Sequence, residues 1–185
     1  MHPEEAHRPS STGHLIDRVI PGTRVHRIGR AGLPARETVI RPDRELWILH
    51  PLGDPPPAGA DPARVQVLLL DGSWRQALEM QRVAGQWGRR VSLPMTGTSR
   101  YWLRAQQGDA QFSTVEALIF LLAALHLEQE AAALRHQFEL HVYANLCARG
   151  RKATAQEFLQ TSPIRTAFPE LLAQLAEKRP LGSRI

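Results

Sequence analysis

The stretch VQVLLLDG, residues 65–72, decides the fold class that the sequence predicts. Its first six residues are a short apolar run with β-branched residues near its start, which is typical of a strand buried on both faces. Asp71 and Gly72 then form a turn signal, and Ser73 is suited to cap a helix that follows. A buried strand that leads directly into a helix indicates an α/β fold with a mainly parallel sheet.

Further elements are predicted on both sides of this stretch. Besides the strand at 65–70, apolar segments predict short strands at 23–28, 46–50 and 91–93, and a candidate further strand at 101–104. Capping residues and helical periodicity predict helices between Thr12 and Pro21, and at 74–84, 113–126, 129–148 and 170–177. We therefore expect one α/β domain over residues 1–150, and a tail over 151–185 whose short helix packs on or extends that domain.

Composition limits the kind of protein. With 185 residues, 43% of them hydrophobic and 22% charged, the chain is long enough for one ordinary folded domain. Its formal net charge is +5 and its sequence pI is about 10.3, and nearly all of the cations are arginines. Arginine matches phosphate geometry and stacks on bases, so this balance favours a nucleic-acid partner, with a general arginine bias of the source genome as the alternative.

Several protein classes are disfavoured. The single cysteine, Cys147, forms neither an internal disulfide nor a cysteine-rich zinc site, and we expect it to be a small buried side chain. His136 and His141 are five residues apart, which puts them on different parts of a helix surface, so no metal site is expected. The sequence has neither a dinucleotide-binding GxGxxG after a strand nor a Walker A segment. The longest apolar run, 117–127, is too short to span a membrane, and no signal peptide is visible, so we expect a cytoplasmic protein.

Asp71 is the first candidate for chemistry. It follows the most buried predicted strand, and ligands of open α/β sheets bind beyond the carboxyl ends of strands. The alternative is that Asp71 only caps the next helix. Trp74 is suited either to the core or to stacking on a base, and Arg75 either to the surface or to a phosphate.

Two later clusters carry similar chemistry. Residues 99–104, SRYWLR, combine Ser99, Tyr101 and Arg104 in a loop region, a mixture that suits RNA bases and phosphates or, alternatively, an edge strand over the core. Residues 113–117, STVEA, begin a helix whose free amide groups could bind a carboxylate, although Ser113 and Glu116 also fit a simple capping box.

In this order, the clusters resemble the DTW-domain family of tRNA-uridine aminocarboxypropyltransferases. The matching segments are LDGSWRQA (70–77), SRYWLR (99–104) and STVEA (113–117), together with the opening HPEE (2–5) and RPSSTGHL (8–15). Ser73 stands where the family usually has threonine, and Ser11 where asparagine is common. Many members carry an N-terminal zinc ribbon that is missing here, so the chain resembles a compact form, with loss of upstream sequence as the alternative.

This resemblance implies a SPOUT-like α/β fold with a knotted cofactor-binding region. It implies transfer of the 3-amino-3-carboxypropyl group from S-adenosylmethionine to N3 of a tRNA uridine. Asp71 is the expected proton acceptor. The residues expected to contact the donor are Leu70, Ser73, Trp74, Ser113, Thr114 and Glu116. Those expected to contact the substrate are Arg8, Thr12, Arg75, Ser99, Tyr101 and Arg104.

Three alternatives stay open at the level of sequence. The chain could be a SPOUT-type RNA methyltransferase, because only the orientation of the donor decides which group is transferred. It could be a non-catalytic RNA-binding protein in which Asp71 merely caps a helix. Its target could also be rRNA, which a related group of enzymes modifies by similar chemistry.

Overall fold

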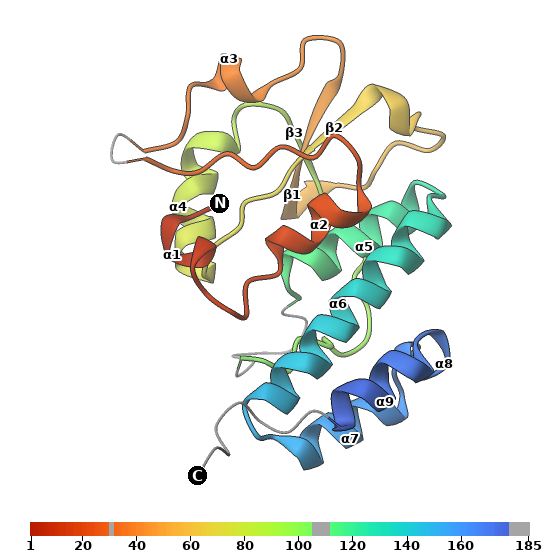
Figure 1. Ribbon diagram of the computed structural model, residues 1–185. Coiled ribbons are helices and arrows are strands. Elements are labelled where there is room, and N and C mark those ends of the chain that lie inside the picture. Colours follow the sequence, from red (N-terminus) through yellow and green to blue (C-terminus); the bar gives the residue numbers. More distant parts are fainter. Residues whose placement is uncertain (30–31, 105–111, 178–185) are drawn as a thin grey trace.

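The centre of the fold is a three-stranded parallel sheet (Figure 1). The computed structural model describes residues 1–29, 32–104 and 112–177. The strands are β1 (Glu45–Asp54), β2 (Val65–Leu68) and β3 (Arg89–Val91), in the order β2-β1-β3. β1 pairs with both neighbours, with Trp47 opposite Val67 on one side and Arg89 on the other. The predicted parallel sheet is therefore present.

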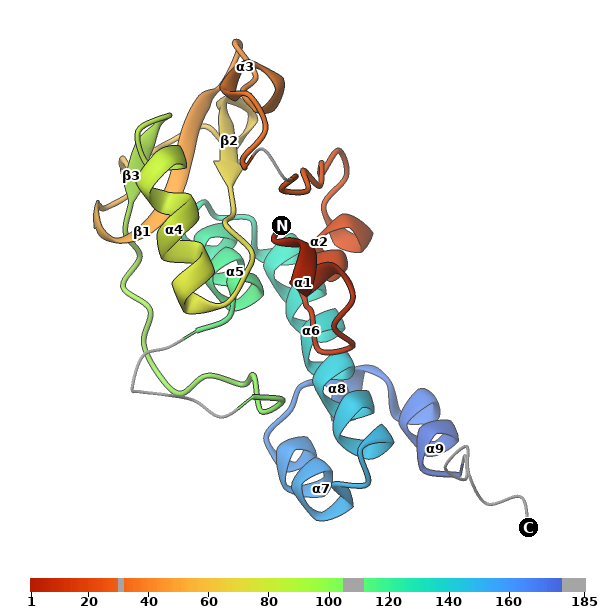
Figure 2. The same cartoon turned by 90° about the vertical axis from the view of Figure 1, so that its left-hand side faces the viewer.

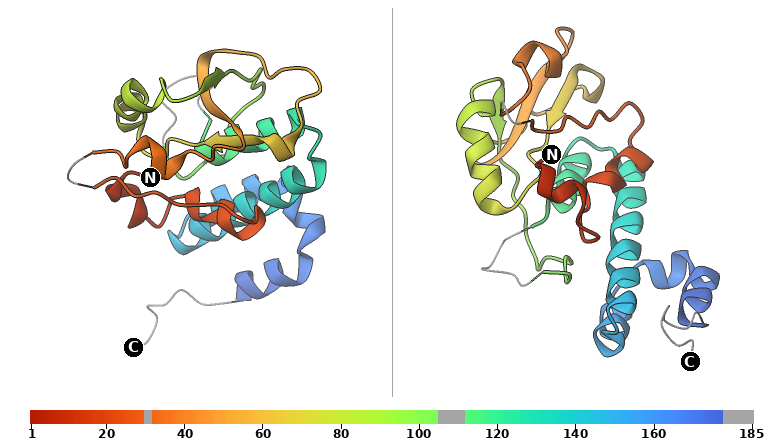
Figure 3. Two further views of the ribbon diagram at one scale, coloured as in Figure 1. Left: turned by 90° about the horizontal axis from the view of Figure 1, so that it is seen from above. Right: turned by 60° about the vertical axis from the view of Figure 1, so that its left-hand side comes forward.

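The sheet is buried because its central strand is apolar on both faces. Leu46, Trp47 and Ile48 are all buried. Alternate residues of a strand point to opposite faces. Trp47 points to one face and packs into the large apolar core cluster, to which Leu46 and Ile48 do not belong. Helix α4 (Trp74–Ala84) and helix α5 (Thr114–Ala124) lie on opposite sides of the sheet (Figure 3).

A second helical layer covers α5. The long helix α6 (Glu128–Ala148) packs along α5, and α2 (Gly13–Val19) packs against both (Figure 2). The shared core of this layer consists of apolar side chains from all three helices, among them Leu15, Leu121, Leu134, Phe138 and Val142.

The C-terminal part is helical. Helices α7 (Lys152–Gln160), α8 (Ile164–Ala167) and α9 (Pro169–Glu177) follow α6, and α7 and α8 pack directly on it (Figure 2). Phe158 and Ile164 are fully buried there. The predicted helix at 170–177 is confirmed as α9, whereas α7 and α8 were not predicted.

The other predicted helices are confirmed within a few residues. They correspond to α2, α4, α5 and α6, and the capping pairs expected at Ser73 and Ser113 are present. The short helices α1 (Pro3–Ala6) and α3 (Arg36–Val39) and the 3-10 turn at Pro62–Arg64 were not predicted. Cys147 is half-buried against the core, less than expected. Within the described parts of the chain, no helix is long and apolar enough to cross a bilayer.

Two predicted strands are wrong. Residues 23–28 are extended but bond to the first residue of the chain instead of the sheet, since Ile28 N donates to Met1 O and the Met1 amino group donates to His26 O. Residues 101–104 form a turn, and Trp102 N donates to Arg100 O. The other strands shift at their ends: β1 continues through Pro51 to Asp54, β2 stops at Leu68, and β3 begins at Arg89.

Candidate active site

Asp71 is fixed where the chain passes from sheet to helix. β2 ends at Leu68, and the chain then runs through Asp71 and Gly72 to the start of α4. A reciprocal capping box holds this corner, because Ser73 N donates to Gln76 Oε1 at 2.8 Å and Gln76 N donates to Ser73 Oγ at 3.4 Å. Ser73 therefore caps α4, and Asp71 itself is left with its side chain available.

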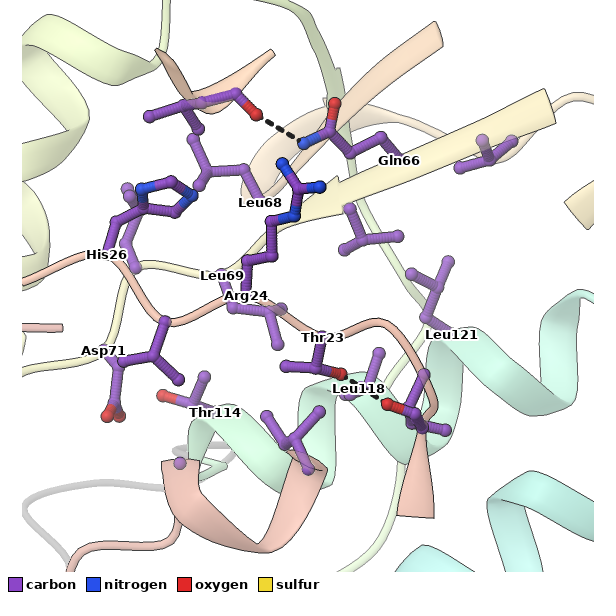
Figure 4. Close-up of a pocket in the computed structure, with 18 of the residues that line it drawn as sticks. Thr23, Arg24, His26, Gln66, Leu68, Leu69, Asp71, Thr114, Leu118 and Leu121 are labelled. Atoms are coloured by element: carbon purple, nitrogen blue, oxygen red, sulfur yellow. Dashed lines mark hydrogen bonds between the residues drawn. The ribbon is translucent and has the colours of Figure 1, made fainter. Parts of the chain in front are cut away.

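The Asp71 carboxyl group faces two other elements. The Thr114 hydroxyl, on the first turn of α5, lies beside it (Figure 4). On the other side is Gly13 at the start of α2, where a Cβ, if the residue had one, would lie only 2.6 Å from Asp71 Oδ2. Asp71 Oδ2 is buried and, among the described residues, has no hydrogen-bond partner. A buried carboxylate oxygen without a hydrogen-bond partner destabilises the folded protein unless a ligand bonds to it.

The surroundings of Asp71 make its charged form less favourable than it is in water. Burial raises the pKa of this carboxyl group, and the negative charge of Glu5 raises it further. The Met1 amino group, the Thr114 hydroxyl and Arg104 act in the opposite direction without cancelling the increase. A carboxyl group with a raised pKa in a cavity is a candidate proton acceptor.

Asp71 lies at one end of a cavity of about 350 Å³ (Figure 4). The cavity is bounded by residues 65–71, by one face of α5 and by the extended segment 20–26. Its apolar wall includes Leu68, Leu69, Leu118 and Leu121, while Thr23, Arg24, His26 and Thr114 add polar groups. Ligand pockets of proteins span roughly 300–1,000 Å³ and combine mostly apolar walls with a few polar groups, so this cavity suits a small organic ligand.

A buried ion pair joins the N-terminal segment to the second cluster. Glu5, only 3% exposed, accepts from Arg8 Nη1 and from Arg104 Nη2, each at 2.7 Å. The Arg104 guanidinium lies 5.7 Å from the centre of the Tyr101 ring, and the Tyr101 hydroxyl donates to the Ser10 carbonyl. The structure thereby brings three of the predicted substrate residues together, and one of them, Arg104, lies close enough to Asp71 to lower its pKa.

Glu116 joins the second cluster to the third. Its carboxylate accepts from Arg100 N at 2.6 Å, from Ser113 N at 2.7 Å and from Ser99 Oγ at 2.9 Å. The residue is only 6% exposed. Glu116 therefore fixes the loop at 99–104 against the first turn of α5, where Thr114 meets Asp71.

The predicted site residues are thus placed in different surroundings. Leu70, Asp71 and Thr114 line the cavity. Ser73 and Ser113 cap helices, and Ser99 and Glu116 form the buried link between clusters. Thr12 is buried immediately before Gly13, whereas Arg75 is exposed on the first turn of α4. The side chain of Trp74 lies outside the part of the chain that the structure describes.

Some residues of the site were not predicted from sequence. Gly13 and segment 23–26 reach the cavity only through the tertiary fold, and Glu5 acts through a partner 99 positions away. Glu5 and Gly13 do lie in the segments HPEE (2–5) and RPSSTGHL (8–15). The resemblance of these segments to the family was the sequence signal that could have identified both residues. Among residues 1–29, 32–104 and 112–177, no group of three or more His, Cys, Asp or Glu side chains is arranged to hold a metal ion.

Comparison with known families agrees with this arrangement. The family described as DTW domain matches residues 1–146, which include Asp71, both later clusters and the N-terminal segment that packs against them. No solved structure matches the chain.

Proposed function

The chain belongs to the DTW-domain family, and from this premise we propose that it transfers the 3-amino-3-carboxypropyl group of S-adenosylmethionine to N3 of a tRNA uridine. Membership in this family indicates a tRNA-modifying enzyme. The identity of the transferred group and of the acceptor atom is what we propose. The observation that carries it is the Asp71 carboxyl group, which has an unpartnered buried oxygen and lies at the end of a cavity.

The cavity has features that fit S-adenosylmethionine. Its leucine wall suits the adenine ring of the donor, and its volume of about 350 Å³ is in the range of small-ligand pockets. The first turn of α5, which reaches the cavity at Thr114, offers helix N-terminal amide groups to the carboxylate of the donor. We further propose that this region corresponds to the knotted cofactor region of a SPOUT-like fold, which a structure with the donor bound would test.

Asp71 performs the proton transfer in this proposal. The uridine N3–H donates its proton to Asp71, and the resulting nitrogen anion is a far better nucleophile. N3 then forms a bond to the γ-carbon of the donor while the bond from that carbon to sulfur breaks, and its electron pair stays on sulfur. The products are the modified uridine and methylthioadenosine, and the proton passes from Asp71 to solvent. Positioning contributes most of the acceleration, because the sulfonium is already a good leaving group.

The residues around Glu5 support the RNA side of the proposal. Arg8 and Arg104 both bond to the buried carboxylate of Glu5, and Tyr101 lies against Arg104. Of this group, Glu5 and Arg104 lie close enough to Asp71 to affect its pKa. Tyr101 offers an aromatic ring for a base, and the arginines offer phosphate-binding guanidinium groups. Arg75, exposed on the nearby first turn of α4, is a further phosphate contact in this proposal.

The direct test is the nucleoside composition of tRNA. Mass spectrometry of tRNA from cells with and without this protein is expected to show an aminocarboxypropyl-uridine only where the protein is present. A methylated uridine instead would identify a methyltransferase, and a modified rRNA nucleoside would move the target to rRNA. Intact RNA binding without binding of S-adenosylmethionine in calorimetry would identify a non-catalytic RNA-binding protein.

The pH dependence of transfer should report Asp71. Its pKa is raised above the ordinary value of 3.8, chiefly by burial and then by Glu5. Because only the carboxylate form accepts a proton, kcat/KM is expected to fall as pH decreases through that raised pKa. In Glu5→Gln one of the raising charges is gone, so the inflection should move to lower pH. An identical profile in both enzymes would contradict the assignment.

Gly13→Ala should show how strongly transfer depends on the position of the Asp71 carboxylate. The new Cβ would lie 2.6 Å from Asp71 Oδ2, so the carboxylate has to move. We expect kcat to fall by up to about 100-fold, since small misplacements of a reacting group have effects of this order. Gly29→Ala is the matched control, because a Cβ there meets open space. Wild-type kcat in Gly13→Ala would contradict this close approach.

A further inference from the structure

Two histidines meet on the surface beside the candidate site. His14, on α2, and His141, on α6, lie edge to face with ring centroids 5.2 Å apart and an interplanar angle of 69°. His14 is exposed and His141 is half-buried. Asn145, one turn further along α6, donates to the His141 carbonyl at 2.9 Å and has its amide 3.4 Å from His141 Nε2. The pair is therefore held by the packing of α2 on α6.

Arg18 lies one helical turn after His14 on α2, and Arg149 lies about two turns after His141 at the C-terminal end of α6, so each arginine is on the same side of its helix as the histidine. Burial, then His14, Arg18 and Arg149, lower the pKa of His141 to about 4. Burial and Arg18 also lower the pKa of His14, while Asp71 and the Ser11 backbone raise it. Arg18 and Arg149 are exposed. Within the described residues, neither arginine forms an ion pair with an Asp or Glu side chain.

The surface borders the Asp71 site. His14 directly follows Gly13, the residue in close approach to Asp71. Arg149 Nη1 donates to the Leu103 carbonyl at 3.0 Å, which ties it to the loop of Tyr101 and Arg104. The charge of Arg149 also affects the pKa of Tyr101. An RNA that places a base at Asp71 would have its backbone next to this surface.

The positions of Arg18 and Arg149 have a simpler partial explanation. Each lies at the C-terminal end of its helix, where a cation stabilises the helix dipole. That explains one cation at each helix end. It does not explain why both cations act on one pair of imidazoles with no acidic partner in the described part of the chain, since like charges in proximity destabilise the folded chain. An anionic ligand would relieve this repulsion.

We propose that Arg18, Arg149 and the His14–His141 pair form the surface that binds phosphodiester groups of the RNA next to the target uridine. The inference rests on the proposed function for the entry of the uridine at Asp71. The arginines form charge-assisted bonds to phosphate oxygens, and the imidazoles add further polar contacts.

The experiment measures binding of an unmodified tRNA transcript by fluorescence anisotropy over a series of salt concentrations. Arg18→Gln and Arg149→Gln are each expected to weaken binding roughly tenfold, as loss of a bond to a charged group does. Each should also reduce the slope of log affinity against log salt by about one. Arg18→Lys and Arg149→Lys, which keep the charge, should retain most of that slope. Arg165→Gln, an exposed arginine on α8, is the matched control and should bind as the wild type does.

Calorimetry with S-adenosylmethionine and thermal unfolding complete the test. Both arginines are exposed and neither lines the cavity, so the glutamine variants should fold and bind the donor like the wild type. Arg149→Gln also loses the bond to the Leu103 carbonyl, which Arg149→Lys can still form, so the lysine variant separates that bond from the charge. Wild-type tRNA affinity and salt slope in both variants would overturn the inference. Weakened tRNA binding together with a wild-type protein that transfers no aminocarboxypropyl group would support this surface and refute the proposed function instead.

Discussion

Asp71→Asn is expected to lower kcat for aminocarboxypropyl transfer by roughly 10²- to 10⁴-fold, the usual contribution of a general acid or base. The substitution keeps the shape of the side chain and removes its ability to accept the N3 proton. Donor binding should change little, because the apolar wall of the cavity and the first turn of α5 are untouched. A labelled donor with unmodified tRNA gives kcat, and calorimetry gives donor affinity.

The same variant should be more stable than the wild type at neutral pH. The pKa of Asp71 is raised in the folded protein, so this group favours folding most at low pH, and its contribution is lost as pH rises through the folded pKa. Above that raised pKa the wild type therefore contains a buried charge with an unpartnered oxygen, which asparagine removes. The gain in unfolding free energy should disappear near pH 3, where the wild-type carboxyl group is protonated.

Together these two results distinguish the roles of Asp71. If Asp71 only completed the start of α4, its replacement would lower stability and leave kcat of the folded enzyme unchanged. Loss of activity together with higher stability is typical of a residue kept for chemistry at the expense of folding. Full activity of folded Asp71→Asn would refute its role as proton acceptor.

The strand-to-helix corner could be predicted because its signals are local. An apolar run, a turn dipeptide and a capping serine all lie within residues 65–76, and the structure places β2, Asp71 and α4 there as expected. The long helices were predictable for the same reason, since their periodicity and caps are contained in the segment itself.

Features that depend on distant partners could not be predicted. Residues 23–28 have a strand-like pattern, but a strand also needs a neighbour with free backbone groups, and this segment meets the first residue of the chain instead of the sheet. The burial of Glu5 depends on Arg104, and the closeness of Gly13 to Asp71 depends on how α2 packs. The sequence predicted which segments carry the site, while the contacts among them required the tertiary structure.

Glu116 is the clearest example of a residue whose local pattern showed only part of its role. The sequence predicted a capping box with Ser113, which is confirmed, and a contact to the donor, which stays a prediction. Its carboxylate also accepts bonds from Ser99 and Arg100, 17 and 16 positions away. One buried charge thereby connects two of the three clusters that define the site.

Glu116→Gln is accordingly expected to lower the free energy of unfolding by about 2–3 kcal/mol, the range for lost bonds to a buried charged group. One carboxylate oxygen accepts from Arg100 N, and the other from Ser113 N and Ser99 Oγ. An amide has only one oxygen, so in either orientation its NH₂ group faces a backbone N–H and that bond is lost. Denaturant unfolding measures the change, and Glu157→Gln, exposed on α7, should stay within about 0.5 kcal/mol of the wild type.

The functional effect of Glu116→Gln should appear mainly in the tRNA step. Release of Arg100 N and Ser99 loosens the loop that carries Tyr101 and Arg104, so KM for tRNA should rise while donor affinity changes less. Glu116→Asp keeps the charge on a shorter side chain and should recover part of the stability. If Glu116 instead contacted the donor directly, Glu116→Gln would weaken binding of S-adenosylmethionine at wild-type stability, and that outcome would contradict a structural role and support the donor contact predicted from the sequence.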